Sequence, residues 1–501
     1  MKILTAEQIR SLDAHTIEHE PIPSIQLMER AAESCVEWLW KEFGEQPYSF
    51  FCGTGNNGGD GLAMARHFSL RKYDCEVYVL GNPQKGSDDF KTNIERLEET
   101  DCRIYYLNEE HHLFTLPKDS LIVDCIFGSG LNRPVEGWRA KIIEQLNKNK
   151  HRKVAIDIPS GLFADRLETQ SDCCLEADIT LTFQVPKRSF LFRENESKVG
   201  RLIVRDIGLD QQFHASLQSD MIFTDLNWAS SVYKDRYQFS HKGTFGHLAI
   251  CGGSKGKIGA VTMAAQAALR SGVGLLTALI PEVGYSVFQQ SVPPAMCLTS
   301  GGKYIVDFEL DLEPTVIAIG PGLGQAEDTA SGLADFLEKN KTQLVIDADG
   351  LNLLAKNQEL LEKLPENSIL TPHPREFDRL FGYHKTDFDR LETLRKKSQE
   401  LKSVIVLKGA FTRTALPDGT VFFNSTGNPG MASGGMGDSL TGIIGALLTQ
   451  GYNAKEAAVL GTFMHGKAAD LALEHQSQES LLATDLPDYL GRVFKLIAKG
   501  N

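Results

Sequence analysis

The polar side chains with the clearest chemistry in this sequence lie in glycine-rich turns. The richest turn, residues 428–438, reads Asn-Pro-Gly-Met-Ala-Ser-Gly-Gly-Met-Gly-Asp and leads directly into an apolar stretch at 439–448. Glycines let successive backbone N–H groups converge at a helix N-terminus, where they bind an anion such as a phosphate. Asp438, the last residue of the turn, is then placed to remove a hydroxyl proton. The structural alternative is a Gly/Ser loop in which Asp438 caps the helix.

A second glycine-rich turn, residues 53–61, reads Gly-Thr-Gly-Asn-Asn-Gly-Gly-Asp-Gly and follows an apolar run at 49–52. It contains GxGxxG, but the acidic residue that a dinucleotide-binding site needs about 20 positions later is missing from 77–81. The Gly-Lys-Ser/Thr of a Walker loop is also missing. The turn therefore predicts phosphate contact without either standard fingerprint, and a tight strand-to-helix turn is the structural alternative.

Two aspartates stand at the ends of apolar runs in the same half of the chain. Asp124 opens the stretch Asp-Cys-Ile-Phe-Gly-Ser-Gly-Leu-Asn-Arg-Pro, and Asp157 opens Asp-Ile-Pro-Ser-Gly. A carboxylate in an apolar run costs stability unless it has a partner, although such residues also serve as helix caps. Together with Asn57 and Ser160, Asp124 offers amide, carboxylate and hydroxyl oxygens, which suit a hard cation.

The second half of the chain contains a histidine between two prolines, in Thr-Pro-His-Pro-Arg-Glu. The prolines fix the backbone on both sides of His373 and present its ring at the end of an apolar run. A structural role is the alternative for a lone histidine. Weaker signals at the ends of other apolar runs in this half are the segments 241–254, 256–260, 320–324 and 408–412.

The elements that position these turns alternate between short apolar runs and helical patterns, which is typical of a parallel, doubly wound α/β sheet. In the first half the predicted strands are 49–52, 75–80, 121–127, 153–158, 178–183 and 201–207, and the predicted helices are 28–43, 61–70 and 88–99. In the second half the predicted strands are 247–251, 275–280, 315–319, 344–347, 368–370 and 404–407, followed by a hairpin across 416–419. Ligands bind at the carboxyl ends of the strands in such sheets, where the turns lie.

A polar stretch without periodicity, roughly 208–239, separates the two alternating halves. We place a domain junction near 210–235, because domain boundaries fall in polar segments of this kind. The chain length of 501 residues is enough for two cores of ordinary domain size. The predicted domains are residues 1–215 and 225–501.

The composition excludes several classes of protein. The 52 Lys and Arg residues and 65 Asp and Glu residues leave a net charge of −13, which opposes a broad basic surface for nucleic acid or a membrane. The nine cysteines lie partly in apolar runs and lack CxxC spacing, so we expect buried thiols rather than zinc ligands or disulfides. The N-terminus begins with a Thr5-x-x-Gln8 capping box and no apolar signal core, and a cytoplasmic protein is expected.

The motifs of the first half resemble those of the epimerase domain of the bifunctional NAD(P)H-hydrate repair enzymes. All three stand intact and in order over residues 53–161. The resemblance implies a Rossmann-like doubly wound fold and a potassium ion held by Asn57, Asp124 and Ser160. It implies substrate contacts at Asn56, Asn57, Gly58, Gly59, Asp60, Gly128, Ser129, Gly130, Leu131, Asn132, Arg133, Pro134 and Asp157.

The motifs of the second half resemble the ribokinase superfamily and, within it, the ADP/ATP-dependent NAD(P)H-hydrate dehydratases. The family's Gly-Thr-Gly-Asp turn reads Gly-Met-Gly-Asp here, so that Met436 replaces a hydroxyl side chain. The resemblance implies Asp438 as the catalytic residue and Mg²⁺ with ADP or ATP as cofactor. It implies hydrate contacts at Ala260, Gly322, Gly324, His373 and Asp438, and nucleotide contacts at Lys408, Gly409, Ala410, Phe411, Thr412 and Gly437.

The two resemblances together predict a metabolite-repair enzyme that restores NADH and NADPH from their hydrates. The first domain is expected to interconvert the R and S hydrates, with Asp157 as acid and base. Asp124 is less suited as the base, because a bound cation would stabilise its carboxylate. The second domain is expected to dehydrate the S hydrate with ADP or ATP. We also expect a homo-oligomer that binds neither nucleic acid nor membrane.

Two alternatives come from other classes of protein. The first is a small-molecule kinase of the ribokinase superfamily, for example a vitamin kinase, with an N-terminal domain that senses nucleotide. The second is a non-enzymatic scaffold, which Asp438 after closely spaced glycines argues against.

Overall fold

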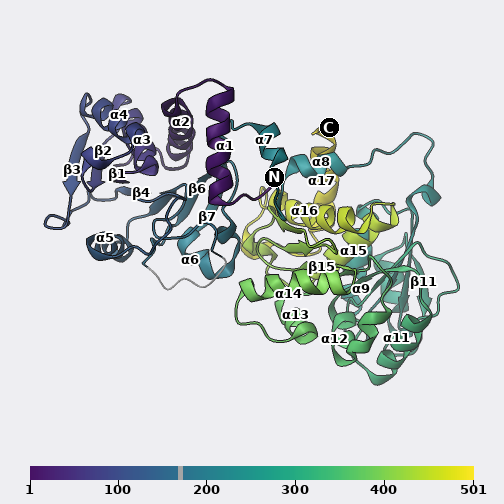
Figure 1. Cartoon of the computed structure of the whole chain (residues 1–501). Coiled ribbons are helices and arrows are strands. Elements are labelled where there is room, and N and C mark those ends of the chain that lie inside the picture. Colours follow the sequence, from purple (N-terminus) through teal and green to yellow (C-terminus); the bar gives the residue numbers. More distant parts are fainter. Residues whose placement is uncertain (167–172, 501) are drawn as a thin grey trace. The chain divides into compact units, whose positions relative to one another are not determined.

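The chain folds into two compact units in a computed structural model that describes residues 1–166 and 173–500. The first unit is Lys2–Ser219, and the second runs from Asp220 onward and includes Met1. Each unit contains its own sheet with helices on both faces (Figure 1). The predicted α/β class is confirmed in both units.

The first unit is built on a seven-stranded parallel sheet with the strand order β3-β2-β1-β4-β5-β6-β7. Its central strands are buried along their whole length because helices cover both of their faces. The strands are β1 (Tyr48–Gly53), β2 (Cys75–Leu80), β3 (Arg103–Leu107), β4 (Leu121–Cys125), β5 (Lys153–Ile156), β6 (Ile179–Phe183) and β7 (Arg201–Arg205).

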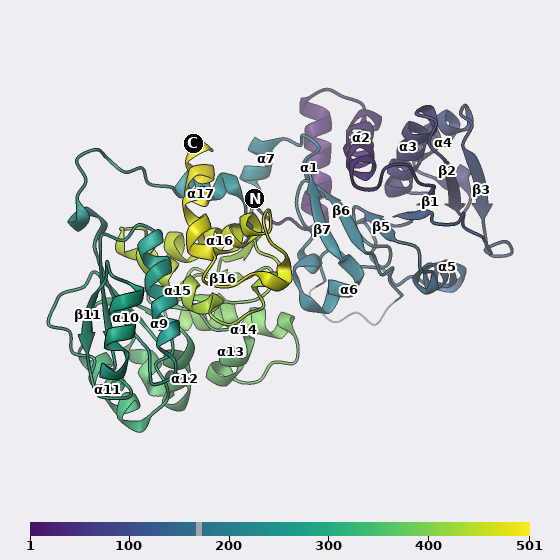
Figure 2. The same ribbon diagram turned by 180° about the vertical axis from the view of Figure 1, so that it is seen from behind.

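Helices α2, α3 and α4 pack on one face of this sheet and α5 packs on the other, which Figure 2 shows from behind. The predicted capping box of α1 is present, with the Thr5 side chain accepting from the Gln8 N–H. The helices are α1 (Ala6–His19), α2 (Ser24–Phe43), α3 (Asn56–Leu70), α4 (Asp88–Glu98), α5 (Gly137–Lys148), α6 (Glu196–Val199) and α7 (Gln211–Ser216).

The second unit is built on a ten-stranded sheet with the order β11-β10-β9-β12-β13-β14-β15-β16-β17-β8. All neighbouring pairs are parallel except those of β16, which forms the predicted hairpin with β17. The strands are β8 (Met221–Thr224), β9 (His247–Cys251), β10 (Leu275–Ile280), β11 (Met296–Thr299), β12 (Val316–Ile319), β13 (Gln343–Ile346), β14 (Ile369–Leu370), β15 (Val404–Leu407), β16 (Arg413–Ala415) and β17 (Val421–Asn424).

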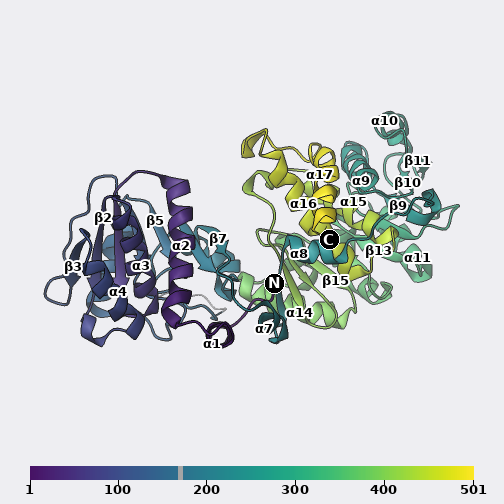
Figure 3. The same cartoon turned by 90° about the horizontal axis from the view of Figure 1, so that it is seen from above.

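Two hydrophobic cores lie on the two faces of this sheet, one under α9, α15, α16 and α17 and the other under α11 and α12. Figure 3 shows α16 on one side of β15 and α14 on the other. The helices are α8 (Leu226–Val232), α9 (Ile258–Arg270), α10 (Tyr285–Ser291), α11 (Glu327–Lys339), α12 (Ala348–Lys356), α13 (Pro374–Phe381), α14 (Asp387–Glu400), α15 (Met436–Thr449), α16 (Ala454–Ala472) and α17 (Leu486–Lys499).

The predicted strands are confirmed, with bounds that differ at the ends, whereas several short elements were not predicted. Strands β3 and β11 were missed, and the polar stretch 208–239 contains α7, β8 and α8. Strand β8 is too short to show periodicity, and its pairing partner β17 lies far away in the sequence. Only the pairing of β8 with β17 in the folded protein reveals that β8 belongs to the second sheet.

The cysteines and the longest helices also bear on the expectations from composition. All nine cysteines are free thiols; six are buried, and Cys102, Cys173 and Cys297 are half-buried. Within the described residues, no helix is both long and apolar enough to cross a membrane.

Candidate active sites

A cavity of about 850 Å³ lies in the first unit, at the carboxyl edge of its sheet. The turns that follow β1, β4 and β5 form the floor of the cavity, and α1 and α2 form one of its walls. The structure therefore brings three separated motifs to one place. The predicted contact residues that line this cavity are Asn56, Asn57, Asp60, Gly128, Ser129, Gly130, Leu131, Asn132, Arg133, Pro134 and Asp157.

Two glycines predicted as substrate contacts, Gly58 and Gly59, do not line the cavity. A Cβ atom on Gly58 would lie 1.7 Å from the carbonyl oxygen of Gly53, and one on Gly59 would lie 2.8 Å from the Sδ atom of Met28. These glycines allow α3 to pack closely against β1 and α2. Their role in the structure is packing, and a substrate contact by either stays a prediction.

Asp157 is held in an ion pair at the end of β5. Its carboxylate lies 2.5 Å from the Nζ atom of Lys187 and accepts a hydrogen bond of 3.0 Å from the Ser129 N–H. Burial favours a higher pKa for Asp157, but Lys187 and the Ser129 N–H outweigh burial, and the pKa lies below its ordinary value. The backbone of Asp157 has a φ of +65°, a left-handed conformation that is costly for a residue with a side chain. Asp157 is therefore a rigidly placed carboxylate.

Lys187 was missed by the sequence analysis. Its side chain is buried and also donates a hydrogen bond of 2.8 Å to the Thr182 hydroxyl. The signal that was available is a lysine four residues after the predicted strand 178–183, at the edge of the sheet where the ligand turns lie. A buried lysine needs a counter-charge, and Asp157 supplies it.

Two further carboxyl groups, Asp13 and Asp60, line the same cavity. Burial and the nearby Asp157 raise the pKa of Asp13 to about 6. The pKa of Asp60 is raised well above its ordinary value by burial and by the charges of Asp157 and Asp13. Three carboxyl groups thus share one cavity but differ in charge state, because only Asp157 is paired with a buried cation.

The predicted potassium ligands Asn57, Asp124 and Ser160 are linked at the floor of this cavity through Phe127, whose N–H donates to the Ser160 hydroxyl and whose carbonyl oxygen accepts from the Asn57 amide. The Ser160 hydroxyl donates to Asp124 Oδ1 at 2.6 Å, and the Ser160 N–H donates to Asp124 Oδ2 at 2.8 Å. The Asn57 side-chain amide donates to the carbonyl oxygens of Phe127 and Ile156, while its Oδ1 atom is buried without a hydrogen-bond partner. Burial raises the pKa of Asp124 to about 6, although the hydrogen bonds from Ser160 oppose the shift. A buried oxygen without a partner, beside a carboxylate and a hydroxyl, fits a hard monovalent cation.

A second cavity, of about 420 Å³, lies in the second unit where α9, α12, α13 and α15 begin. The predicted contacts Ala260, Gly322 and Asp438 line it. Gly324 is next to it, because its N–H donates a hydrogen bond of 2.9 Å to Asp349. The lining residues are Gly256, Lys257, Gly259, Ala260, Met263, Gly322, Ala348, Asp349, Asn352, Glu376 and Asp438.

The turn before α15 has the geometry that its glycines predict. Gly435 has a φ of +93° and precedes the helix, and no side chain caps the first N–H groups. Asp438 lies in the first helical turn rather than at the cap, so the capping alternative does not hold. Burial and the nearby Asp347 raise the pKa of Asp438 to about 7, while Lys408 opposes them. The helix N-terminus is free for an anion beside a carboxyl group that ionises near neutral pH.

Lys408 and Gly437, two predicted nucleotide contacts, come together under this turn. The Lys408 ammonium donates to Asp347 at 2.6 Å, and the Thr441 hydroxyl donates to the other oxygen of Asp347 at 2.8 Å. A Cβ atom on Gly437 would lie 3.1 Å from the Lys408 Nζ atom. The lysine is therefore anchored directly beside the anion-binding turn. Asp347 was not singled out from the sequence, although it ends a predicted strand.

The other predicted nucleotide contacts, Gly409, Ala410, Phe411 and Thr412, form a tight turn after β15. The Gly409 N–H donates to the Thr412 hydroxyl at 3.2 Å, and that hydroxyl donates to the Gly409 carbonyl oxygen at 2.8 Å. Gly409 and Ala410 are exposed. The turn presents its backbone to solvent next to Lys408, and its contact with a nucleotide stays a prediction.

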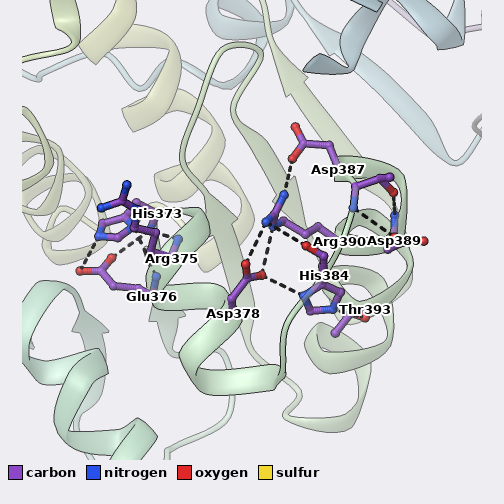
Figure 4. Close-up of polar contacts among 10 residues, drawn as sticks. His373, Arg375, Glu376, Asp378, His384, Asp387, Asp389, Arg390 and Thr393 are labelled. Atoms are coloured by element: carbon purple, nitrogen blue, oxygen red, sulfur yellow. Dashed lines mark hydrogen bonds and ion pairs between the residues drawn. The ribbon is translucent and has the colours of Figure 1, made fainter. Parts of the chain in front are cut away.

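His373 caps α13 and does not line the cavity (Figure 4). Its Nδ1 atom accepts from the N–H groups of Arg375 at 3.1 Å and Glu376 at 3.3 Å. Burial and the charge of Lys408 lower the pKa of His373, so the ring is neutral with its proton on Nε2. The structural role weighed for this histidine is present, and its contact with the hydrate stays a prediction.

Met436, which replaces the family's hydroxyl residue, is buried in the core under α15. Its side chain packs with the helices that form this core. The backbone N–H groups and Asp438 keep their places around it. The substitution therefore changes the core beneath the turn rather than the groups that face the cavity.

The folds and sites together define the class of this protein. The second unit is a ribokinase-like α/β domain with an anion turn and a carboxyl group at its end, and the first is a Rossmann-like doubly wound domain with a separate cavity. Residues 248–492 match the family described as NAD(P)H-hydrate dehydratase, and residues 24–189 match the family described as YjeF-related protein N-terminus.

Relatives match over nearly the whole chain. The bifunctional NAD(P)H-hydrate repair enzyme Nnr of Moorella thermoacetica is 38% identical over 99% of this chain and 97% of its own length. The enzyme of the same name from Escherichia coli is 33% identical over 97% of this chain and 93% of its own length. The chain belongs to the family of bifunctional NAD(P)H-hydrate repair enzymes.

A solved structure supports the same relationship for part of the chain. The ADP/ATP-dependent NAD(P)H-hydrate dehydratase of Bacillus subtilis, co-crystallised with ATP and Mg²⁺, is 33% identical in sequence. It covers 55% of this chain and 98% of its own, with a TM-score of 0.50.

Proposed function

We propose that this enzyme repairs hydrated NADH and NADPH in two steps carried out by its two units. Residues 1–215 interconvert the R and S hydrates, and residues 225–501 dehydrate the S hydrate with ADP or ATP. The observation that carries the proposal is Asp438, a carboxyl group with a pKa of about 7 beside an uncapped helix N-terminus. A non-enzymatic scaffold has no use for a half-buried carboxyl group poised in this way.

Asp438 is the base of the proposed dehydration. It takes the proton of the C6 hydroxyl, and the hydroxyl oxygen then attacks the terminal phosphorus of the nucleotide. The bond from that phosphorus to the bridging oxygen breaks, and the nucleotide leaves with one phosphate fewer. The N–H groups at the start of α15 and the ammonium of Lys408 stabilise the phosphate charge as it moves. Phosphate then leaves C6 with the electrons of the C6–O bond, pushed by the lone pair of the ring nitrogen. Loss of a proton from C5 to water then forms the C5=C6 double bond of NADH or NADPH.

Mg²⁺ would enter this site with the nucleotide. Within residues 1–166 and 173–500, no group of three or more His, Cys, Asp or Glu side chains is placed to hold a metal ion. Mg²⁺ commonly binds through substrate phosphates, water and one or two carboxylates, so this site needs no preformed cluster of side chains. When bound, Mg²⁺ supplies positive charge to the phosphoryl group.

Asp157 is the acid and base of the proposed epimerisation, and Asn57, Asp124 and Ser160 hold potassium beside it. When bound, potassium supplies a fixed positive charge that orders the turn after β1. Replacing potassium with a bulky organic cation at constant ionic strength should slow epimerisation, because screening is then unchanged. Asp124→Ala should have the same effect and leave dehydration intact. An epimerase rate indifferent to both changes would contradict the cation site.

Incubation of the purified enzyme with NADH hydrate and either ADP or ATP tests the proposal. Recovery of NADH absorbance is the expected result, and the faster nucleotide is the donor. A stable phosphorylated product without recovered NADH would instead identify a small-molecule kinase. The family match favours dehydration over that alternative.

A further inference from the structure

The cavity of the first unit contains a carboxyl group that none of the sequence motifs includes. Asp13 lies in α1, before residue 24, where the match to the family begins. Its side chain lines the cavity together with Asp60, Asp157 and Lys187. The helix therefore contributes an ionisable group to a site that is otherwise built from strand ends.

Asp13 and Asp157 reach the cavity from different walls. Asp157 follows β5 at the floor, where Lys187 and the Ser129 N–H hold it. Asp13 comes from the helical wall, in company with Ile9, Ile17 and Leu27. Inversion of a carbon centre needs a proton-transfer group on each face, because one bond to oxygen breaks on one face and another forms on the opposite face.

We propose that Asp13 is a second catalytic residue of the epimerase site and acts on the face of the hydrated ring opposite Asp157. This inference rests on the proposed epimerase function. It assigns to α1 a chemical role in addition to its packing.

The step balances with one proton given and one taken. Protonated Asp13 gives its proton to the C6 hydroxyl, the C6–O bond breaks with its electron pair on oxygen, and water leaves. The N1 lone pair forms an N1=C6 double bond. A water molecule then attacks C6 from the other face, the N1=C6 electrons return to N1, and Asp157 accepts the proton of that water. In the reverse direction the two carboxyl groups exchange roles.

The electrostatics of the cavity support the assignment of Asp13 as the acid and Asp157 as the base. Asp157 is ionised beside Lys187, whereas burial and Asp157 raise the pKa of Asp13 to about 6. Two carboxyl groups with separated pKa values suit an acid and a base. Burial and the charges of Asp157 and Asp13 raise the pKa of Asp60 well above its ordinary value, which favours its protonated form. The other charged groups that line the cavity are Arg10, Asp89, Arg133, Glu136, Arg139 and Lys187.

Asp13→Asn tests the proposal in the full-length enzyme, with chromatography of the R and S hydrates as the readout. Its kcat for epimerisation should fall at least about 100-fold, while KM for the hydrate stays within about threefold. Dehydration of the S hydrate by the same preparation should be unchanged, and the circular dichroism and thermal unfolding of the variant should match those of the native enzyme, which shows that the first unit, where Asp13 lies, is folded. Glu7→Gln, which removes an exposed carboxylate from the same helix, should leave both activities unchanged.

The pH profile separates catalysis from a structural role. Epimerisation needs a single proton shared by the pair, so kcat/KM of the native enzyme should fall as pH rises through about 6. Asp13→Asn should lose this limb of the pH profile, which is the fall of kcat/KM as pH rises through about 6. Asp13→Glu should keep the limb, although its epimerisation rate should be lower. Loss of the limb in Asp60→Asn but not in Asp13→Asn would overturn the assignment to Asp13.

The outcomes also separate this inference from the function on which it rests. If the native enzyme does not interconvert the hydrates, the proposed epimerase function fails. If the native enzyme is active and Asp13→Asn keeps its rate and its pH limb, the role of Asp13 alone is overturned.

Discussion

Asp157 and Asp438, the proposed bases of the two reactions, are held in different charge states by their neighbours. Asp157 is paired with a buried lysine and has a lowered pKa. Asp438 is half-buried near Asp347, and the ammonium of Lys408, which lowers the pKa of Asp438, is already bonded to Asp347. The first therefore stays ionised, while the second gains and loses a proton near neutral pH.

Asp438→Asn should reduce nucleotide-dependent dehydration at least about 100-fold, because the amide cannot accept the hydroxyl proton. Epimerisation should remain. In the native enzyme the dehydration rate should rise as pH rises through about 7, since the ionised form is the base. Asp335→Asn, at an exposed position in α11, is the matched control. A variant that keeps more than about a tenth of the native rate would rule out Asp438 as the base.

The same substitution should stabilise the second unit. A raised pKa means that the folded state binds the proton of Asp438 more tightly than the unfolded state does, so ionisation costs stability. That cost starts as pH rises past the ordinary value of 3.8 and is complete above about 7. Asp438→Asn should therefore gain on the order of 1–3 kcal/mol at pH 8 and progressively less toward pH 4. Thermal unfolding across this pH range measures the gain, and a pH-independent difference would contradict the explanation.

At the scale of elements, glycine contacts decide how closely helix α3 approaches the first sheet. Gly58 touches the backbone of β1, whereas a Cβ atom on Gly55 would meet nothing within 4 Å. The two residues share one turn but differ in what surrounds them. In the second unit, by contrast, α13 and α14 are joined by charge, because Arg390 donates to both Asp378 and Asp387 (Figure 4).

Gly58→Ala should destabilise the first unit by about 2 kcal/mol or more, because the added methyl group would overlap the Gly53 carbonyl and push α3 away from β1. Gly55→Ala, in the same turn, should cost less than about 1 kcal/mol. Chemical unfolding followed by a signal from the first unit compares the two variants. Equal stabilities would show that α3 shifts without cost.

At the scale of the molecule, each unit contains a complete sheet, its own hydrophobic cores and its own cavity. All residues assigned to the first site lie within Lys2–Ser219, and all residues assigned to the second site lie within Asp220–Asn501. The two reactions are therefore expected to be separable, although they act on one substrate.

Expression of residues 1–219 and 220–501 as separate chains should give two folded proteins, the first with epimerase and the second with dehydratase activity. A second chain that begins at 226 lacks β8 and so exposes the edge of β17. It should be less soluble than the chain that begins at 220. Failure of the 1–219 and 220–501 chains to fold separately would reveal a shared core.

The sequence by itself determined the α/β class, the central strands and the turns that carry the sites. Those features depend on local signals: apolar runs, glycines, and an Asp at a strand end such as Asp157 or Asp124. Tertiary structure decided which distant groups face them. Lys187 and Asp13 flank Asp157, Asp347 lies near Asp438, and β8 joins β17, all through contacts between segments far apart in the chain. Charge state depends on burial and on neighbouring charges, and both exist only once these segments are brought together.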